Sequence, residues 1–216
     1  MRVKVAVFFA LLLTSLPLLA GALMPCVKAS SSASGNFLVV TTMEYQSADA
    51  HKVQQVTLDI FPKETFINAK DRVVSPSTFW NNSPLWSVVL NSANSRPWVP
   101  ACPVSLVTDD GEFLVIIGSD VVAGGSPLRI FRRRDHPGKP FGGQGPDHGV
   151  LVRDIPLNQL WPAGKLSEAS VITDESPEWY AGGTFVFSSD SRTLVHKSRW
   201  GATVRVKLSD GSVSSE

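Results

Sequence analysis

Alternating apolar and polar side chains predict short β-strands along most of the chain. In residues 203–208 every second side chain is apolar, which is the pattern of a strand with one buried face. Two earlier strands begin near Phe185 and Leu194, and residues 188–191 and 200–201 supply the turns between the three. Serine and aspartate suit such turns because their side chains hydrogen-bond the nearby backbone. The C-terminal part is therefore predicted to be a three-stranded antiparallel meander.

The same unit occurs once before. Residues 107–115 can be laid over 187–195, which lie 80 positions later. An alternating strand follows each copy, at 128–131 after the first and at 204–207 after the second. A strand, a short polar turn and a second strand are also the pattern of single blades in WD40-like propellers, although any two β-meanders share it in part. Two copies are fewer than a closed propeller needs, so closure is not implied.

Further strands extend this pattern, and the fold class is predicted to be all-β. The chain of 216 residues is 43% hydrophobic and 18% charged, as in folded proteins, and its 15 prolines and 16 glycines favour many short strands over long helices. One or two short helical turns are expected, one of them at Pro156–Trp161. Residues 37–216 are predicted to form a single β-rich domain, and its further strands are expected at 37–45, 53–61, 86–90 and 151–155.

The N-terminus predicts export. Arg2 and Lys4 precede an apolar run, and the small residues of 20–22 follow at a spacing typical of a cleavage site. Residues 1–22 are therefore predicted to be a secretory signal peptide, with an alternative end at residue 29, and 23–36 to be a flexible linker. No second apolar stretch of spanning length follows. A secreted or periplasmic protein without a membrane span after signal cleavage is expected.

The net charge bears on the class of partner, and the cysteine content bears on whether a disulfide forms. The net charge of +1 provides no electrostatic footprint for nucleic acid, so no nucleic-acid partner is expected. The two cysteines, Cys26 and Cys102, could form a disulfide in an oxidising compartment if cleavage follows Ala22. If cleavage instead follows Ala29, Cys102 is left alone.

The long irregular stretch at 132–149 holds the main candidate chemistry. Asp135-His136 and Asp147-His148 are two acid–imidazole pairs twelve residues apart among several glycines. Imidazole and carboxylate groups together suit a divalent metal, or a general base with an orienting acid. In the alternative interpretation these side chains cap turns or face solvent.

Three arginines lead into this stretch. Arg133 is the centre of the run 132–134, and a guanidinium group can hold a phosphate or carboxylate through two parallel hydrogen bonds. The alternative is a solvated strand end, or an edge strand defended by charge.

Two further sets of residues have a functional and a structural interpretation. Asp109, Asp110 and Glu112 could hold calcium, but turn chemistry explains them without it. Tryptophans exposed on one face could stack on sugars, whereas a core position is expected for at least four of the six. The six are Trp80, Trp86, Trp98, Trp161, Trp179 and Trp200.

At residues 185–194 and 106–111 the chain resembles uncharacterised secreted bacterial proteins with WD40-like, β-propeller-like segments. The resemblance covers the C-terminal half. The Trp-Asp and Gly-His dipeptides of a typical WD40 repeat are absent. The resemblance implies an exported binding or scaffold protein, and it carries over no catalytic residue.

The sequence thus favours an exported, non-enzymatic binding or scaffold module with a protein or glycan partner and no cofactor. One alternative is a secreted metal-dependent hydrolase that uses a divalent metal in the loop from Asp135 to His148. Another alternative is a carbohydrate-binding module. Convergence of the two histidines with a carboxylate would favour the enzyme, and an exposed strip of tryptophans would favour sugar binding.

Overall fold

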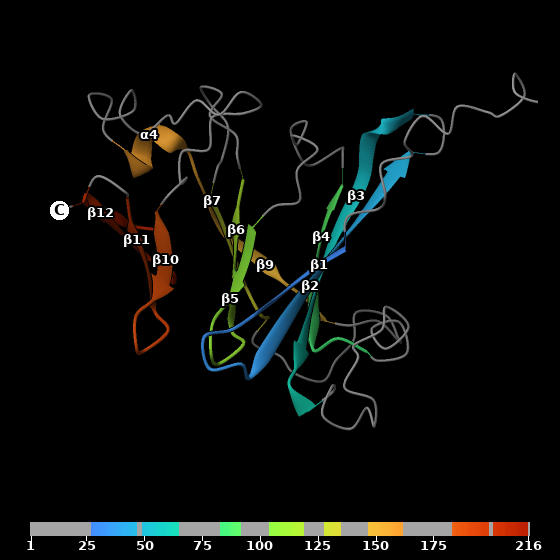
Figure 1. Cartoon of the computed structure of the whole chain (residues 1–216), viewed down its shortest axis with the longest axis horizontal. Coiled ribbons are helices and arrows are strands. Elements are labelled where there is room, and N and C mark those ends of the chain that lie inside the picture. Colours follow the sequence, from blue (N-terminus) through green and yellow to red (C-terminus); the bar gives the residue numbers. More distant parts are fainter. Residues whose placement is uncertain are drawn as a thin grey trace, which may run out of the picture.

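The protein is all-β, as the sequence predicts. The computed structural model describes residues 27–46, 49–64, 83–91, 104–118, 128–134, 147–161, 183–198 and 201–215, and these form three β-sheets and one helical turn. The first sheet has the order β1-β2-β3-β4-β8, the second β5-β6-β7-β9 and the third β10-β11-β12-β13 (Figure 1). Each contains four antiparallel strands, and β8 adds a parallel strand to the first sheet.

The strands of the first sheet are β1 Val27–Ser31, β2 Phe37–Gln46, β3 Asp49–Pro62, β4 Trp86–Asn91 and β8 Asp147–His148. Those of the second sheet are β5 Val104–Val107, β6 Phe113–Ile117, β7 Leu128–Arg132 and β9 Val150–Ile155. Those of the third are β10 Thr184–Phe187, β11 Thr193–Lys197, β12 Thr203–Lys207 and β13 Val213–Ser215. The helical turn α4, Leu157–Leu160, follows β9 where the sequence predicts it.

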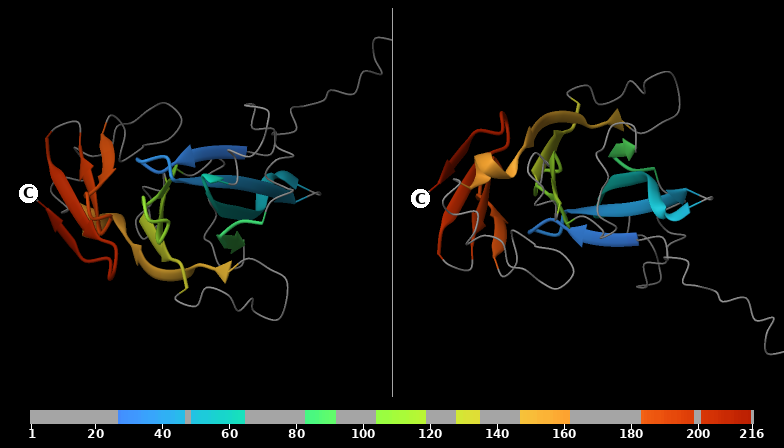
Figure 2. Two further views of the ribbon diagram at one scale, coloured as in Figure 1. Left: turned by 90° about the horizontal axis from the view of Figure 1, so that it is seen from below. Right: turned by 90° about the horizontal axis from the view of Figure 1, so that it is seen from above.

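The three sheets stack side by side in chain order (Figures 1 and 2). The second sheet lies in the middle and is covered on both faces, which is why all five residues of β6 are buried and why its sequence is an uninterrupted apolar run. One core lies between the first and second sheets and includes Ile60, Trp86 and Leu114. The other lies between the second and third sheets and includes Ile130 and Leu194. Burial of each such side chain contributes about 1.5–3 kcal/mol, so these two cores hold the stack together.

A threonine side chain stabilises the turn between β5 and β6, the first two strands of the second sheet. Thr108 Oγ1 accepts a hydrogen bond from the Phe113 N–H (3.0 Å) and donates one to Asp110 Oδ1 (2.6 Å). The Glu112 N–H donates to the same carboxylate oxygen, and the Gly111 N–H donates to the Thr108 carbonyl. Gly111 has a φ of 67°. Turn chemistry therefore accounts for the acidic residues at this position, as one interpretation of the sequence expects.

The same turn occurs 80 positions later, between β10 and β11, the first two strands of the third sheet. Ser188 Oγ accepts from the Thr193 N–H (2.9 Å) and donates to Asp190 Oδ1 (2.5 Å), and the Arg192 N–H donates to that oxygen. Ser191 takes the place of the glycine and has a φ of 57°. The repeat predicted from the sequence is thus confirmed at the level of individual hydrogen bonds.

The first sheet contains a third copy of the turn. The Phe37 N–H donates to Ser32 Oγ (3.2 Å), the Asn36 N–H donates to Ser34 Oγ (3.3 Å), and Gly35 has a φ of 71°. In each of the three sheets the same six-residue turn therefore joins the first two strands.

Two segments differ from the expectation of irregular structure. Residues 27–31 lie in the predicted flexible linker, yet they pair with β2 as strand β1, because the turn at Ser32–Phe37 folds them back. Cleavage after Ala29 would remove the first three residues of this strand. The tail after Asp210-Gly211, which is polar and is expected from the sequence to be frayed, also forms a strand, β13, which pairs with β12. In the part of the chain that the structure describes, no helix is long and apolar enough to cross a membrane.

Candidate binding site

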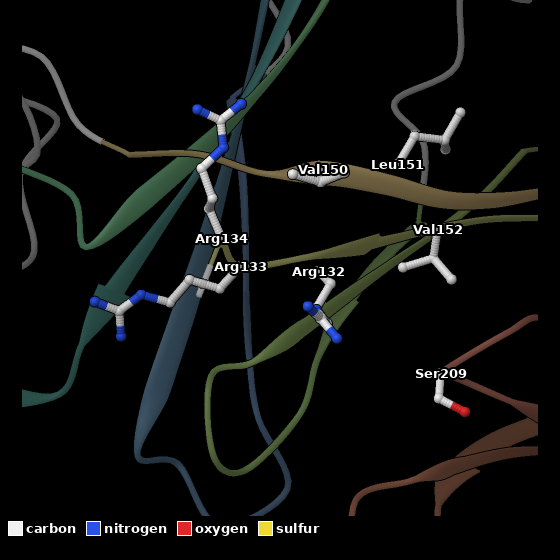
Figure 3. A pocket seen from close by; sticks show the side chains of 7 residues that line it. All are labelled: Arg132, Arg133, Arg134, Val150, Leu151, Val152 and Ser209. Atoms are coloured by element: carbon white, nitrogen blue, oxygen red, sulfur yellow. The ribbon is translucent and has the colours of Figure 1, made fainter. Parts of the chain in front are cut away.

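A groove of about 370 Å³ lies where β7 ends, between the second and third sheets (Figure 3). One side is formed by the three arginines that follow Phe131, and another by the first residues of β9. Ser209, in the turn between β12 and β13, contributes from the third sheet. The residues that line the groove are Arg132, Arg133, Arg134, Val150, Leu151, Val152 and Ser209.

The backbone of the arginine run is fixed by the turn of the second sheet. Arg132 pairs with Phe113 in the ladder between β6 and β7, and the Arg133 N–H donates to the Glu112 carbonyl (2.8 Å). The corresponding residues of the other sheets make the same bond, from Lys63 to the first turn and from Leu208 to the third. The arginines therefore leave the sheet from a fixed point at its turn edge.

The three guanidinium groups do not converge. In Figure 3 those of Arg132, Arg133 and Arg134 point in three different directions. Nε of Arg133 is buried and has no hydrogen-bond partner among the described residues. The arrangement provides positive charge along a line rather than a single pocket for one small anion.

The opposite side of the groove is apolar and open to solvent. Val150 and Leu151 are 45% and 47% exposed, and they begin β9, which is an edge strand of the second sheet among the described residues. Val150 pairs with Arg132, so the apolar and the charged side chains are neighbours across the two strands. Large apolar side chains exposed next to arginine are characteristic of interaction surfaces.

The third sheet is held against this strand by its β12–β13 turn. Arg153 of β9 packs over Gly211, so closely that a Cβ at residue 211 would lie 2.7 Å from the Arg153 Cβ. This contact places Ser209 at the mouth of the groove.

The structure describes only part of the predicted acid–imidazole loop. Asp147 and His148 form β8, which pairs in parallel with β4, rather than lying in irregular structure as the sequence suggests. The reason is non-local, because β8 pairs with residues of β4 that lie 61 positions earlier in the sequence. Asp135 and His136 lie outside the described residues, so the hypothesis that they share a site with His148 is not tested. Cys26 and Cys102 also lie outside them, and so does the disulfide that they could form.

His148 joins a polar row that sequence reasoning missed. It pairs with Ser87, which pairs with Asp59, and partners in register present their side chains on the same face of a sheet. Ser87 Oγ donates to Asp59 Oδ1 (2.5 Å), and burial raises the pKa of the Asp59 carboxyl despite this hydrogen bond. Because the serine proton is directed to the carboxylate and not to the imidazole, the row lacks the hydrogen-bond order of a serine nucleophile activated by histidine. The alternation of Thr57 and Asp59 with apolar residues is the signal that predicts their common face.

The other candidate residues that the structure describes lie in the core or in turns. Trp86 and Trp161 are both buried, as expected of core tryptophans, and the remaining four lie outside the described residues. Asp109 accepts the Ser34 N–H (2.7 Å), which lowers the pKa of its carboxyl. Among the residues that the structure describes, no group of three or more His, Cys, Asp or Glu side chains is arranged to hold a metal ion.

The fold and the groove define an all-β protein of three blade-like sheets with an arginine-lined surface at one edge. No protein-family model matches the chain, and no curated protein matches it. Among solved structures, the β-propeller domain of Cps50 (Swd1) from Myceliophteria thermophila resembles it with a TM-score of 0.40 and 10% sequence identity. The match covers 88% of this chain and 40% of that one, so the chain spans less than half of the length of that domain.

Proposed function

We propose that this protein is an exported, non-enzymatic binding module that holds a partner macromolecule at the groove between Arg132–Arg134 and the start of β9. The observation that carries the proposal is the combination of half-exposed Val150 and Leu151 with three arginines on one rigid edge. Apolar area supplies affinity on desolvation, and arginine supplies directional contacts to anionic groups. A stack of sheets fixed by two apolar cores presents these groups with little loss of conformational freedom on binding.

Export is the second part of the proposal and rests on the predicted signal peptide at residues 1–22. N-terminal sequencing of the protein recovered from the periplasm or medium tests it. We expect a mature chain that begins at residue 23, which keeps β1 intact. An intact N-terminus in a cytosolic fraction would contradict this part.

Binding is tested with two pairs of variants. The full-length chain with a C-terminal tag is used to isolate partners from the cell that produces it, and each partner is then purified and titrated by calorimetry. Val150→Glu is compared with Val186→Glu, because Val186 is a valine of similar exposure (51%) on the third sheet. Arg133→Glu is compared with Lys197→Glu, an exposed cation on β11.

The proposal predicts at least a tenfold rise in Kd for the two groove variants and less than a twofold change for the two controls, with melting temperatures as for the unsubstituted chain. Equal weakening by groove and control variants would refute the groove as the binding surface. Absence of any partner that binds the purified chain would refute the function itself.

A further inference from the structure

We infer that the partner contacts this groove with an extended, acidic and apolar peptide segment that pairs with the free edge of β9 as an additional strand. The inference rests on the proposed binding function and names the chemistry of the partner. It follows from the backbone of β9, from its side chains and from the spread of positive charge beside it.

The backbone of β9 is available on one side. It is the last strand of the second sheet among the described residues, and it pairs with β7 only. The unpaired N–H and C=O groups of an edge strand are a template for another extended chain. The outer edge of the first sheet already accepts such an addition, because β8 pairs with β4 there. Gly149 then leads directly from β8 into β9.

The side chains of β9 favour its first half as the place where an added strand pairs. Residues 150–152 carry no charge, and two of them are half exposed. In the second half Arg153 packs on the third sheet, and Asp154 pairs with Arg129 at 3.0 Å. The ladder with β7 also shifts register at Val152, which lies between Leu151, the partner of Phe131, and Arg153, the partner of Ile130. Charges and bulges protect edges against pairing, so an added strand is expected to begin at Val150 and to end at this bulge.

The charge distribution favours an extended chain over a compact anion. Arg132 lies beside Val150, and the next two arginines continue past the end of the strand with their guanidinium groups pointing apart. Carboxylates spaced along a peptide match positive charge that is spread along a line better than the compact charge of a single phosphate does. The exposed Val150 and Leu151 favour a peptide over a sulfated glycan, because a glycan has no apolar side chains to cover them.

The test uses a fluorescein-labelled decapeptide of alternating glutamate and valine, titrated with the full chain and followed by fluorescence polarisation. Two derivatives carry N-methyl groups on alternate residues, one derivative on the odd and one on the even positions. Alternate N–H groups of an extended strand point to the same side, so only one derivative retains the N–H groups that face β9. We expect that one to bind as the parent peptide does and the other at least tenfold more weakly.

Two controls separate strand pairing from charge attraction. A peptide with lysine in place of glutamate should not bind, and Arg133→Glu should weaken the parent peptide at least tenfold while Lys197→Glu leaves it unchanged. Where Val150→Glu lowers the melting temperature, Val150→Thr provides the milder test of the apolar contact. Inorganic phosphate and a sulfated glycan are titrated as competing probes.

Equal binding of both N-methylated peptides would overturn strand pairing. Binding of the sulfated glycan but of no peptide would overturn the choice of a peptide. In either case the proposed binding function stands if Val150→Glu, but not Val186→Glu, still abolishes binding of the purified natural partner. The two failures can therefore be told apart.

Discussion

Arg192 lies in the turn between β10 and β11 of the third sheet and forms an ion pair with Glu112. Glu112 occupies the corresponding position in the turn between β5 and β6 of the second sheet. The Arg192 guanidinium carbon also lies 5.6 Å from the centre of the Phe113 ring. One step along the stack, the Ser34 N–H of the first turn donates to Asp109 of the second. The repeated turns thus contact one another in a row along one edge of the stack.

A double-mutant cycle measures the strength of the ion pair between Arg192 and Glu112. Because both side chains are partly exposed, we expect a coupling free energy of only about 0.5 kcal/mol between Arg192→Ala and Glu112→Ala, lost at high salt. Urea denaturation of the four chains at low and at 1 M salt checks it. A salt-independent coupling above roughly 2 kcal/mol would show that the pair is shielded from solvent.

The glycine of the second turn is predicted to be essential for packing between sheets. Gly111 and Gly35 both have positive φ values, but a Cβ on Gly111 would lie 2.6 Å from the Phe37 ring, whereas Gly35 has open space around it. Gly35→Ala should therefore cost about 1 kcal/mol from backbone strain alone, and Gly111→Ala about 3 kcal/mol. Chemical denaturation of the two variants provides the comparison. Equal losses would mean that the Phe37 ring moves aside freely.

The third turn is predicted to be under backbone strain. Ser191 has a φ of 57°, a region that glycine adopts without cost. Ser191→Gly should therefore raise the free energy of unfolding by up to about 1 kcal/mol. Ser189→Gly, at an exposed position of the same turn without a positive φ, should instead leave stability unchanged or lower it. A lower melting temperature for Ser191→Gly than for the unsubstituted chain would contradict this account.

Stability is predicted to fall on mild acidification because of His196. This side chain is buried between the second and third sheets, stacked on Phe185 at 4.3 Å and edge-on to Trp161. Burial lowers the pKa of His196 below its ordinary value of 6.5, although its hydrogen bond with the Thr184 carbonyl acts in the opposite direction. Below pH 6.5 the unfolded chain binds a proton that the folded chain rejects, so the stability present above that pH is lost as the pH falls toward the folded pKa.

The melting temperature between pH 8 and pH 5 tests this prediction. His196→Phe should remove most of the decline over the range from pH 6.5 to 5, while Lys197→Gln, on the neighbouring exposed position, should leave it in place. An unchanged pH profile in His196→Phe would assign the decline to other groups.

The sequence predicted the second and third sheets well and the first only in part. Residues 107–115 and 187–195 place a polar turn that contains an aspartate between two apolar segments, and both the turn and the apolar segments are local signals. The first turn carries serine where the others carry aspartate, so Ser31–Ser34 resembles a linker of small polar residues. The signal that could have identified it is the segment 35–39, GNFLV, which is identical to 111–115, GEFLV, at every position except Asn36 against Glu112.

The candidate site was less predictable because it depends on pairings between distant residues. The arginine run is visible in the sequence, but its apolar neighbours are defined only when Val150 pairs with Arg132. In the same way, a strand of two residues such as Asp147–His148 has no periodicity, and its pairing with β4 follows from the fold alone. The row from Asp59 through Ser87 to His148 needs three strands in register, which no local pattern specifies.

The central claim is that a partner binds where β9 meets the three arginines. The most direct measurement is the affinity of the purified partner for Val150→Glu and for Val186→Glu, two valines of similar exposure on different sheets. The account predicts at least a tenfold loss of affinity for Val150→Glu and less than a twofold change for Val186→Glu, at unchanged melting temperature. Unchanged affinity of Val150→Glu, or a loss of equal size in both variants, would contradict it.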